Sequence, residues 1–495
     1  MRRPALRGLW RCAGSAPLTW GNTLRKTLRT LIAATSAAAV TGGLLAVAAS
    51  PATAAPSGLQ GDFNGDGYRD LAIAAPLAKV GGKSNAGSVS IVYGGKSGLN
   101  TAKSALIHQN TPGIPGAAEQ GDMFGDTLAA GDLDGDNYTD LVVGVHADQV
   151  GKTDDSGSVT VVWGGARGLG SGTDLSSPLP DSRNAFGWDV AVGDFTGDGA
   201  ADIAVLNGVF DGLHVFKGPI SRKGVAEGRQ DMDALGHDGV VDRIVAGEVD
   251  GRPGMELLAL GHERGAVLTA GGKGLRRAGL VPGGYSAAIG DVDKDGYGDV
   301  VTGNFAEKSS DEPTGTLGGG ITVSYGAMNG LSDRARVRIN QDTKGVPGTA
   351  EKNDFFGWSV SAGDTDGDGY ADVAIGAIGE SIGKVKQTGT VTVLRGSAKG
   401  LTGAGAKSFA QSTKGVPGSD EAQDGFGYAV KLSDIDGDGR SELAASAFAE
   451  DKGAGAVWRF RTDKNGVTAT GSASFNARTV GGVSGLSYFG SDLVN

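Results

Sequence analysis

Short runs that alternate apolar and polar residues recur along the chain. Four of them are nearly alike and are bounded by glycine: "GSVSIVYGG" from Gly87, "GSVTVVWGG" from Gly157, "GGITVSYG" from Gly319 and "GTVTVLRG" from Gly389. β-Branched residues at every second position are typical of half-buried strands. The pattern therefore predicts an all-β chain made of short strands.

Other apolar runs follow clusters of acidic residues, and this combination occurs seven times. The copies are "GDFNGDGYRDLAIAAP" from Gly61, "GDLDGDNYTDLVVGV" from Gly131, "GDFTGDGAADIAVL" from Gly193, "GEVDGRPGMELLAL" from Gly247, "GDVDKDGYGDVVTG" from Gly290, "GDTDGDGYADVAIG" from Gly363 and "SDIDGDGRSELAAS" from Ser433. In four copies a Phe-Gly pair stands eight residues before the leading aspartate, at Phe124, Phe186, Phe356 and Phe426. Each unit predicts four strands, with the acidic loop between the first two and a weaker fourth strand such as Arg336 to Gln341.

The units are expected to close into a ring, because a single four-stranded sheet cannot bury both of its faces. The first copy has an acidic loop but no preceding Phe-Gly strand, whereas the chain ends in "SYFGSDLVN", a Phe489-Gly490 strand with no acidic loop after it. These two halves predict one blade. Residues 55–495 would then form a seven-bladed β-propeller of four-stranded antiparallel blades, with blade one completed by residues 486–495. An open solenoid is the alternative, but it gives no reason to split one unit between the chain ends.

The Phe-Gly pair, the Asp-x-Asp-Gly-Asp-Gly-x-x-Asp loop and a following "AIGA" or "AIAAP" resemble the FG-GAP repeats of integrin α-subunit propellers and of their bacterial secreted relatives. The match covers nearly all of the chain after its N-terminal segment, although copy four would not be recognised alone. The resemblance implies that bound ions brace each blade at one face of the propeller. The phenylalanine is expected to fill space between blades, and the glycine to permit close backbone approach.

The acidic loops predict calcium sites. Carboxylates about 4–5 Å apart repel one another by about 1 kcal/mol even in water, so a cation is expected among them. Calcium takes six to eight oxygen ligands, and positions 1, 3, 5 and 9 of the loop, with the carbonyl at position 7, would supply them. An EF-hand is excluded because position 12 lacks its bidentate Glu, magnesium would need tighter octahedral geometry, and zinc would need His or Cys, which these loops lack.

The expected ligands follow the same positions in six copies. They are Asp62, Asn64, Asp66, Asp70 and the Tyr68 carbonyl in copy one; Asp132, Asp134, Asp136, Asp140 and Tyr138 in copy two; Asp194, Thr196, Asp198 and Asp202 in copy three; Asp291, Asp293, Asp295, Asp299 and Tyr297 in copy five; Asp364, Asp366, Asp368, Asp372 and Tyr370 in copy six; and Asp434, Asp436, Asp438, Glu442 and Arg440 in copy seven. Thr196 is a weaker ligand, and Glu442 would reach the ion with one more methylene.

Copy four is expected to bind no metal. Glu248, Asp250 and Glu256 surround Arg252 and Pro253, and a fixed positive charge in the loop should exclude a cation. We therefore expect four to six calcium ions, mainly structural. A solvated acidic turn without any ion is the alternative for each loop.

The N-terminal 54 residues predict a secretory signal peptide. They hold seven basic residues and no acid, followed by an apolar run from Leu31 to Ala49 and a small-residue cleavage pattern at Ala52 and Ala54. A retained N-terminal anchor is the alternative. Removal would change the net charge from −11 to −18 and would take away Cys12, the only cysteine, so bound metal is the expected staple.

These features favour a secreted, extracellular binding or adhesion module for a protein or glycan. The acidic balance argues against nucleic acid, no later stretch is long enough for a membrane span, and we expect a monomer. Candidate contacts are the variable loops "GKTDDSG" from Gly151 and "EKSSDEPTG" from Glu307, and the acidic inserts "GVPGTAEKND" and "GVPGSDEAQD" before Phe-Gly. The alternative is a propeller hydrolase or lyase acting on polysaccharide or ester. It has no sequence support, because the five histidines stand alone and every strong acidic cluster is assigned to metal.

Overall fold

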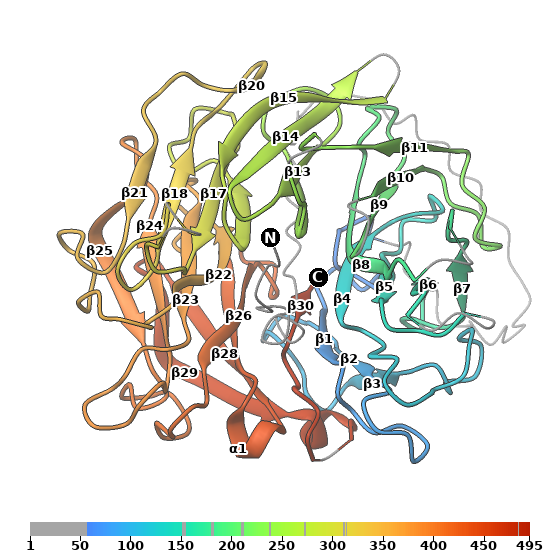
Figure 1. Ribbon diagram of the computed structural model, residues 1–495. Helices are drawn as coiled ribbons and strands as arrows, with labels where there is room; N and C mark the ends of the chain where they lie inside the picture. The colour runs from blue at the N-terminus through green and yellow to red at the C-terminus, as the bar shows by residue number, and fades with distance from the viewer. Residues whose placement is uncertain are drawn as a thin grey trace, which may run out of the picture.

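The computed structural model describes residues 57–495, apart from 151–154, 180–182, 209–211, 237–238, 272–273, 310–311, 313 and 484. The expected signal peptide, residues 1–54, lies outside these residues, as does part of each variable loop named above. Seven four-stranded antiparallel sheets are arranged around a central axis, in chain order from blue to red (Figure 1). The predicted seven-bladed β-propeller is confirmed, and the open solenoid is wrong.

The first strand of each blade lies nearest the axis and contacts the first strands of its neighbours. These strands are β30 (Leu493–Val494), β4 (Thr127–Gly131), β8 (Phe186–Gly193), β12 (Arg243–Gly247), β16 (Ser286–Gly290), β22 (Phe356–Gly363) and β26 (Phe426–Ser433). The second strands, which follow the acidic turns, are β1 (Leu71–Ala75), β5 (Asp140–Val145), β9 (Asp202–Asn207), β13 (Glu256–Leu260), β17 (Asp299–Asn304), β23 (Asp372–Ala377) and β27 (Glu442–Ala447).

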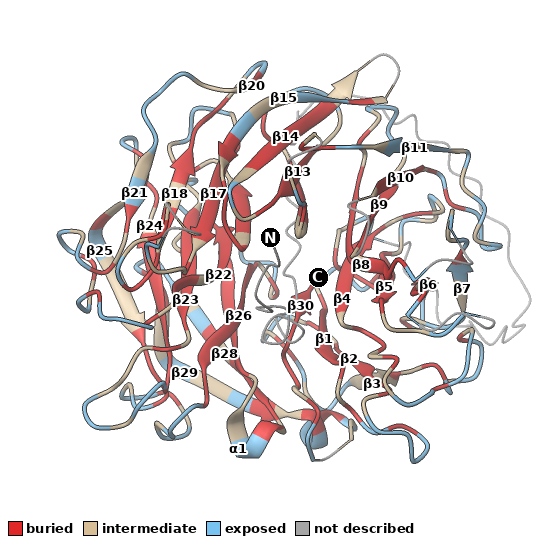
Figure 2. Ribbon diagram, viewed as in Figure 1, coloured by how far each residue is buried: buried red, intermediate tan, exposed pale blue. Residues whose placement is uncertain are grey.

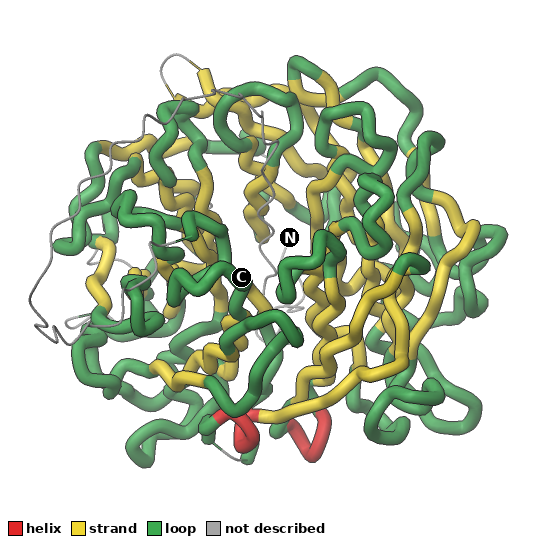
Figure 3. The backbone as a smooth tube through the Cα atoms, turned by 180° about the vertical axis from the view of Figure 1, so that it is seen from behind, coloured by secondary structure: helices red, strands yellow, loops and turns green. Residues whose placement is uncertain are grey.

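The third and fourth strands extend each blade outward. The third strands are β2 (Ser88–Val92), β6 (Ser158–Val162), β10 (Leu213–Lys217), β14 (Arg264–Gly271), β18 (Gly320–Ser324), β24 (Thr390–Arg395) and β28 (Ala456–Asp463). The outer strands are β3 (Ser104–Ile107), β7 (Gly172–Leu175), β11 (Gly228–Met232), β15 (Gly274–Pro282), β21 (Val337–Ile339), β25 (Thr402–Phe409) and β29 (Gly466–Asn476). A small hairpin, β19 (Gly326–Ala327) with β20 (Gly330–Leu331), and two short helices, α1 (Glu450–Gly453) and η1 (Ala477–Val480), complete the described elements. Seen from behind, both helices lie at the rim (Figure 3).

Burial decreases from the axis to the rim. Second strands such as β1, β5 and β9 are buried along their whole length, whereas the outer strand β11 alternates between intermediate and exposed positions (Figure 2). The hydrophobic clusters join neighbouring sheets; one of them packs Val89 and Ile91 of β2 against Leu128 and Val143 of blade two. Burial of apolar area between facing sheets is therefore what holds the ring together.

The Phe-Gly pairs pack as expected between blades. The phenylalanines at 124, 186, 356, 426 and 489 are all fully buried. The close backbone approach also involves a glycine of the preceding blade: a Cβ added to Gly389 would lie 2.2 Å from the carbonyl oxygen of Phe426. This position requires glycine because any side chain would collide with the next blade.

The C-terminal segment closes the first blade. β30 pairs antiparallel with β1, with Val494 opposite Ala72 and Leu493 opposite Ile73. The Phe489-Gly490 pair itself was expected in the strand but lies in the turn before it, with Gly490 at a φ of +90°. Its backbone N–H still donates to the carbonyl of Ala74 at 2.9 Å, so the turn remains attached to blade one.

Truncating Phe489 should open this closure. We expect Phe489→Ala to lower the free energy of unfolding by about 3–5 kcal/mol, because it removes a fully buried ring between the two ends of the chain. Leu486→Ala is the matched control, since Leu486 is 55% exposed in the same segment and should change stability by less than about 0.5 kcal/mol. Denaturant unfolding measures both, and equal effects would show that the segment does not close the ring.

Candidate metal centres

Each acidic cluster forms the tight turn that joins the first strand of a blade to its second strand. In copy six the turn connects β22 to β23, and Gly363 pairs with Asp372 at its base. All seven turns therefore lie at the same edge of their sheets. They join strands rather than helices, which agrees with the exclusion of an EF-hand.

The first aspartate of the turn holds the backbone in its wrapped form. The two carboxylate oxygens of Asp62 accept hydrogen bonds from the N–H groups of Gly65 and Gly67, both at 2.7 Å. Asp364 does the same with Gly367 at 2.7 Å and Gly369 at 2.8 Å. Local bonds of this kind compete with the sheet ladder and stabilise the turn.

The ninth residue is a buried carboxylate that connects the turn to the third strand. Asp70 is fully buried, and its oxygens accept from the N–H groups of Phe63 and Gly94, each at 2.9 Å. Equivalent pairs of bonds fix Asp140, Asp202, Asp299 and Asp372. A carboxylate offers about four lone-pair sites, so two remain for another partner.

Burial makes these carboxylates costly to ionise. Desolvation, opposed by the backbone hydrogen bonds and reinforced by neighbouring aspartates, raises the pKa of Asp70, Asp140 and Asp299 to about 7. The same causes raise the pKa of Asp202 and Asp372 to about 6, and burial raises that of Glu442 to about 7. A cation beside them would reverse these shifts, because it favours the charged form.

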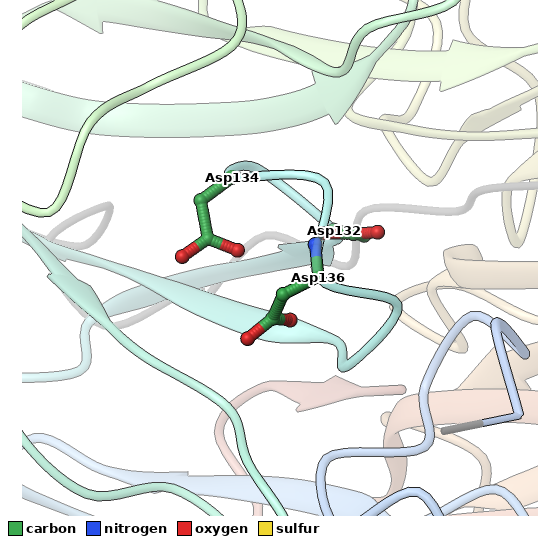
Figure 4. A group of neighbouring side chains, drawn as sticks. All are labelled: Asp132, Asp134 and Asp136. Carbon is green, nitrogen blue, oxygen red and sulfur yellow. Dashed lines mark hydrogen bonds between the residues drawn. The ribbon is translucent and has the colours of Figure 1, made fainter. Parts of the chain in front are cut away.

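The structure brings three acids together in five of the seven turns, with one oxygen of each within 4.8 Å of the others. Copies two and five use positions 1, 3 and 5, as Asp132, Asp134 and Asp136 show around one turn (Figure 4). Copies four, six and seven use positions 1, 3 and 9 instead. In copies one and three the third position is Asn64 and Thr196, so their groups contain fewer acids. The five groups are Asp132, Asp134, Asp136; Glu248, Asp250, Glu256; Asp291, Asp293, Asp295; Asp364, Asp366, Asp372; and Asp434, Asp436, Glu442.

The remaining predicted ligands line the same turns. The fifth-position carboxylate accepts the N–H of the seventh residue, as Asp295 does from Tyr297, Asp368 from Tyr370 and Asp438 from Arg440, all at 3.0 Å. Asp66 with Tyr68, Asp136 with Tyr138 and Asp198 with Ala200 repeat this bond. The seventh residue therefore lies at the turn as expected.

The donor set fits a hard cation. Every side chain in the five groups offers carboxylate oxygen, which is the ligand that calcium prefers. In addition, Asp134 Oδ1, Asp293 Oδ1 and Thr196 Oγ1 are buried without a hydrogen-bond partner, and all three stand at the third position. Unpartnered buried oxygens at a repeated position are what a missing ligand would satisfy.

Arginines contact these turns, and these contacts were not predicted from the sequence. Arg222 binds Asp134 at 2.5 Å and Asp136 at 2.7 Å, reaching across from blade three, while Arg334 pairs with Asp293 and Arg395 with Asp366. The only sequence signal is a basic residue at or after the third strand of a blade, and this does not show which carboxylate it contacts. These guanidinium groups supply positive charge beside the acids.

In copy four the guanidinium of Arg252 points away from the acids, although the sequence predicted a positive charge among them. Glu248, Asp250 and Glu256 converge, and Arg252 extends away to donate to Asn329 Oδ1 at 2.5 Å, leaving its Nε 3.9 Å from Asp250. Burial raises the pKa of Glu248 to about 7. The expected exclusion of metal from this copy stays a prediction.

Hydrogen bonds link the turns of neighbouring blades. The carbonyl of the first residue accepts the N–H of the eighth residue of the next copy: Asp62 from Thr139 at 3.1 Å, Asp291 from Ala371 at 2.8 Å and Asp364 from Ser441 at 2.6 Å. Between the last and first copies, Arg69 Nη1 donates to the carbonyl of Asp434 at 3.1 Å. A change in the backbone of one turn would therefore alter its hydrogen bonds to the adjacent blade.

Three of the five histidines lie beside a carboxylate, although the sequence predicted that all five stand alone. His146 lies 3.0 Å from Asp126, His214 lies 2.7 Å from Asp231, and His262 lies 2.9 Å from Asp242. Each partner comes from a different strand or loop, so sequence spacing could not reveal the pairs.

Fold and turns together define a β-propeller whose acidic clusters resemble calcium sites. The model described as FG-GAP repeat matches residues 54–92, 283–317 and 356–394, and the model described as FG-GAP-like repeat matches residues 132–205. The chain is an FG-GAP repeat protein, related to integrin α-subunits and to phosphatidylinositol-glycan-specific phospholipase D.

The curated relatives are matched over short parts of their length. Mouse phosphatidylinositol-glycan-specific phospholipase D is 31% identical over 161 residues, which is 32% of this chain and 19% of that protein. Integrin alpha-8 from mouse is 32% identical over 182 residues, covering 36% of this chain and 15% of the integrin, and human integrin alpha-8 is 41% identical over 85 residues, covering 17% and 7%. The chain thus spans about a fifth or less of these proteins.

Solved structures give a weaker likeness. A protein from Lactobacillus plantarum aligns with a TM-score of 0.44 and 13% identity over 86% of this chain and 98% of its own. An exotype rhamnogalacturonan lyase aligns with a TM-score of 0.44 and 15% identity over 83% and 72%. In the part of the chain that the structure describes, no helix has the length and apolar character to cross a membrane.

The buried ninth-position carboxylates predict how the metal-free protein responds to pH. Their folded pKa values lie above the unfolded value, so the folded state holds the proton more tightly and stability falls as pH rises through about 7. We expect the melting temperature of metal-free protein to decrease from about pH 5 to about pH 8. The double variant Asp70→Asn, Asp140→Asn should flatten this slope, and a wild-type melting temperature that is constant or rising over this range would contradict the prediction.

Proposed function

We propose that the chain is a calcium-binding β-propeller that acts as a rigid, monomeric recognition module for an extracellular protein or glycan. One observation carries the recognition role. At the edge of the sheets opposite the acidic turns, a continuous band of aromatic side chains runs across five blades. It comprises His262, Tyr285, Phe305, Trp358, Tyr428, Phe448 and Tyr488.

The band is continuous because each ring contacts the next. Successive centroids are 4.5 Å apart from His262 to Tyr285 and again from Tyr285 to Phe305, and 4.6 Å from Phe305 to Trp358. From Trp358 the separations are 5.6 Å to Tyr428, then 4.2 Å to Phe448, then 5.1 Å to Tyr488. Such spacing is favourable for aromatic packing, and it keeps each ring in a fixed orientation.

Several members of the band are partly exposed, so the band forms surface as well as core. Trp358, Phe448, Tyr488 and His262 are all intermediate in exposure. Partly exposed Trp and Tyr on a rigid scaffold are the residues that most often dominate binding energy at interfaces. Their flat faces also suit the apolar faces of sugar rings, which supports a protein or glycan ligand.

Calcium is the cation that best matches the turns. All the converging donors are oxygens, one third-position oxygen in each of copies two, three and five lacks a hydrogen-bond partner, and the family match covers five of the turns. Binding there would stabilise the hydrogen bonds between adjacent turns and so stiffen the ring that presents the aromatic band. The signal-like N-terminus, and the absence of cysteine after it, support an extracellular location.

A second candidate function is a propeller hydrolase or lyase, and one cluster favours it. His262 Nε2 lies 2.9 Å from Asp242, its Nδ1 lies 3.9 Å from Glu312, and Tyr285 donates to Glu312. These carboxylates raise the pKa of His262 against the effect of its burial. Acid and base groups at one end of an aromatic band could serve general acid–base chemistry.

Chelation tests the calcium part of the proposal. We expect excess chelator to lower the melting temperature by at least about 5 °C and added calcium to restore it, because each saturated site contributes about 2.7 kcal/mol at a hundredfold excess over its Kd. Asp366→Asn should reduce calcium binding, whereas Asp333→Asn, the same change at an exposed residue outside the turns, should not. An unchanged melt in chelator would remove the stabilising role of calcium.

Substitution in the band tests the recognition part. A glycan and matrix-protein array with calcium present should identify ligands whose binding weakens at least about tenfold in Trp358→Ala, a typical loss for an interfacial aromatic. Met328→Ala is the control, because Met328 is 59% exposed on the β19–β20 hairpin near the acidic turns. An equal loss of ligand affinity in Trp358→Ala and Met328→Ala would show that the aromatic band is not the binding surface. Product release from a polysaccharide or ester panel, abolished by His262→Ala, would favour the enzyme.

A further inference from the structure

An arginine contacts the third-position aspartate in three of the acidic turns, each time through the same carboxylate oxygen. The pairs are Arg222 Nε with Asp134 Oδ2 at 2.5 Å, Arg334 Nη1 with Asp293 Oδ2, and Arg395 Nη2 with Asp366 Oδ2. The three aspartate side chains are only 14%, 6% and 5% exposed. Each guanidinium therefore lies against a carboxylate that water reaches poorly.

The three arginines reach the turns by different routes. Arg222 lies in the loop after β10 of the next blade, Arg334 follows the β19–β20 hairpin of its own blade, and Arg395 ends β24. Duplication of one repeat would have placed them at equivalent positions, so duplication does not explain the shared contact. What the three have in common is the positive charge that they bring to the third position.

Two of these guanidinium groups are stacked on an aromatic ring. Arg222 lies 5.5 Å from the ring centroid of Trp163, and Arg334 lies 3.5 Å from that of Tyr325. Both rings directly follow a third strand, β6 or β18, and the strand register places Arg395 itself at the equivalent position of blade six. The aromatic face favours the guanidinium, which keeps its contact with the carboxylate in one place.

An arginine accompanies the third-position carboxylate and is missing where that carboxylate is missing. Copies two, five and six each hold four carboxylates, at positions 1, 3, 5 and 9, whereas copies one and three hold three. In those two copies the third residue is Asn64, which bonds within its own turn, or Thr196, whose Oγ1 has no partner, so no arginine contacts either residue. Copies four and seven, which also have an acid at position 3, carry an arginine inside the turn, Arg252 and Arg440.

A fourth carboxylate destabilises the metal-free turn, because like charges at this spacing repel one another. A guanidinium on Oδ2 offsets part of that repulsion, and it leaves the other oxygen available, since Asp134 Oδ1 and Asp293 Oδ1 have no hydrogen-bond partner. In a calcium-bound turn the same guanidinium would instead be a second positive charge beside the ion, which repels it. The arginine therefore stabilises the metal-free turn more than the calcium-bound turn.

We propose that Arg222, Arg334 and Arg395 are built-in counter-ions that stabilise the turns of blades two, five and six without metal and thereby lower their calcium affinity. The inference rests on the proposed calcium binding, to which it adds the residues that set the affinity. By linkage, whatever stabilises the metal-free state more than the bound state weakens binding by the same free energy. Blades one and three, which have no such arginine, depend on calcium alone to offset their acids.

Removal of one arginine from the full chain tests this proposal. Arg222→Gln should bind calcium at copy two roughly three- to tenfold more tightly than wild type, the range expected for one half-exposed charged hydrogen bond. Its melting temperature should fall in the metal-free protein and stay near that of wild type in saturating calcium. Lys223→Gln is the matched control: it removes the same charge from the same exposed loop, and Lys223 makes no bond to the turn among the described residues, so affinity should change less than about twofold. Arg222→Lys keeps the charge and should stay close to wild type.

Trp163 allows the affinity of copy two to be measured separately from that of the other turns. It follows β6 at the edge of the turns, whereas the other tryptophans among the described residues, Trp188, Trp358 and Trp458, stand near the starts of β8, β22 and β28, toward the opposite edge. Terbium bound at copy two in place of calcium should luminesce when tryptophan is excited. Displacement of terbium by calcium then gives the calcium affinity of this turn, and Trp163→Phe gives the background signal.

Three results would overturn the inference while leaving calcium binding intact. They are unchanged or weaker calcium binding in Arg222→Gln, an equal loss of melting temperature with and without calcium, and the same change in Arg222→Lys as in Arg222→Gln. The second result would assign the arginine a packing role that does not depend on the ion. Absence of terbium and calcium binding in wild type would refute the calcium function itself together with this inference, so the two failures are distinguishable.

Discussion

Each blade depends on one buried carboxylate at the start of its second strand. This group bonds to its own turn and to the end of the third strand, so it fixes three of the four strands at one edge, as Asp70 does with Phe63 and Gly94. Its desolvation is offset only in part by those hydrogen bonds, which leaves an electrostatic cost that grows with every neighbouring aspartate. The acidic turn thus holds three strands of the blade together. It is also where repulsion between carboxylates destabilises the fold most.

The ring carries this local constraint from one blade to the next. Turns of adjacent blades share hydrogen bonds at one edge, phenylalanines and glycines interlock between sheets, and aromatic rings touch at the other edge. Because the two edges belong to the same short strands, their chemistry is coupled through rigid β-structure rather than through loops. The acidic turns lie at one edge of the sheets and the aromatic band lies at the other, where Asp242 and Glu312 also contact the band.

Much of this structure could be predicted from the sequence. The repeated acidic run, its fixed distance from Phe-Gly and the unit divided between Asp62 and Phe489 give seven blades and their closure, because these signals are local and repeat in phase. The partners of the acids could not be predicted. Arg222 reaches Asp134 from another blade, His262 meets Asp242 and Glu312 across loops, and Gln341 meets Glu380 between sheets. Such contacts depend on how blades are rotated against each other, which no single repeat encodes.

Closure of the first blade by β30 also has a consequence for synthesis. β1 ends at Ala75, yet its neighbour on the axial side is Val494, so the first sheet has an unpaired edge until almost the whole chain has left the ribosome. Bringing such distant segments together is slow compared with forming hairpins, and an open strand edge is prone to aggregation in the meantime. Blades two to seven each draw their four strands from one continuous stretch of chain, and they can assemble in order while blade one waits for its last strand.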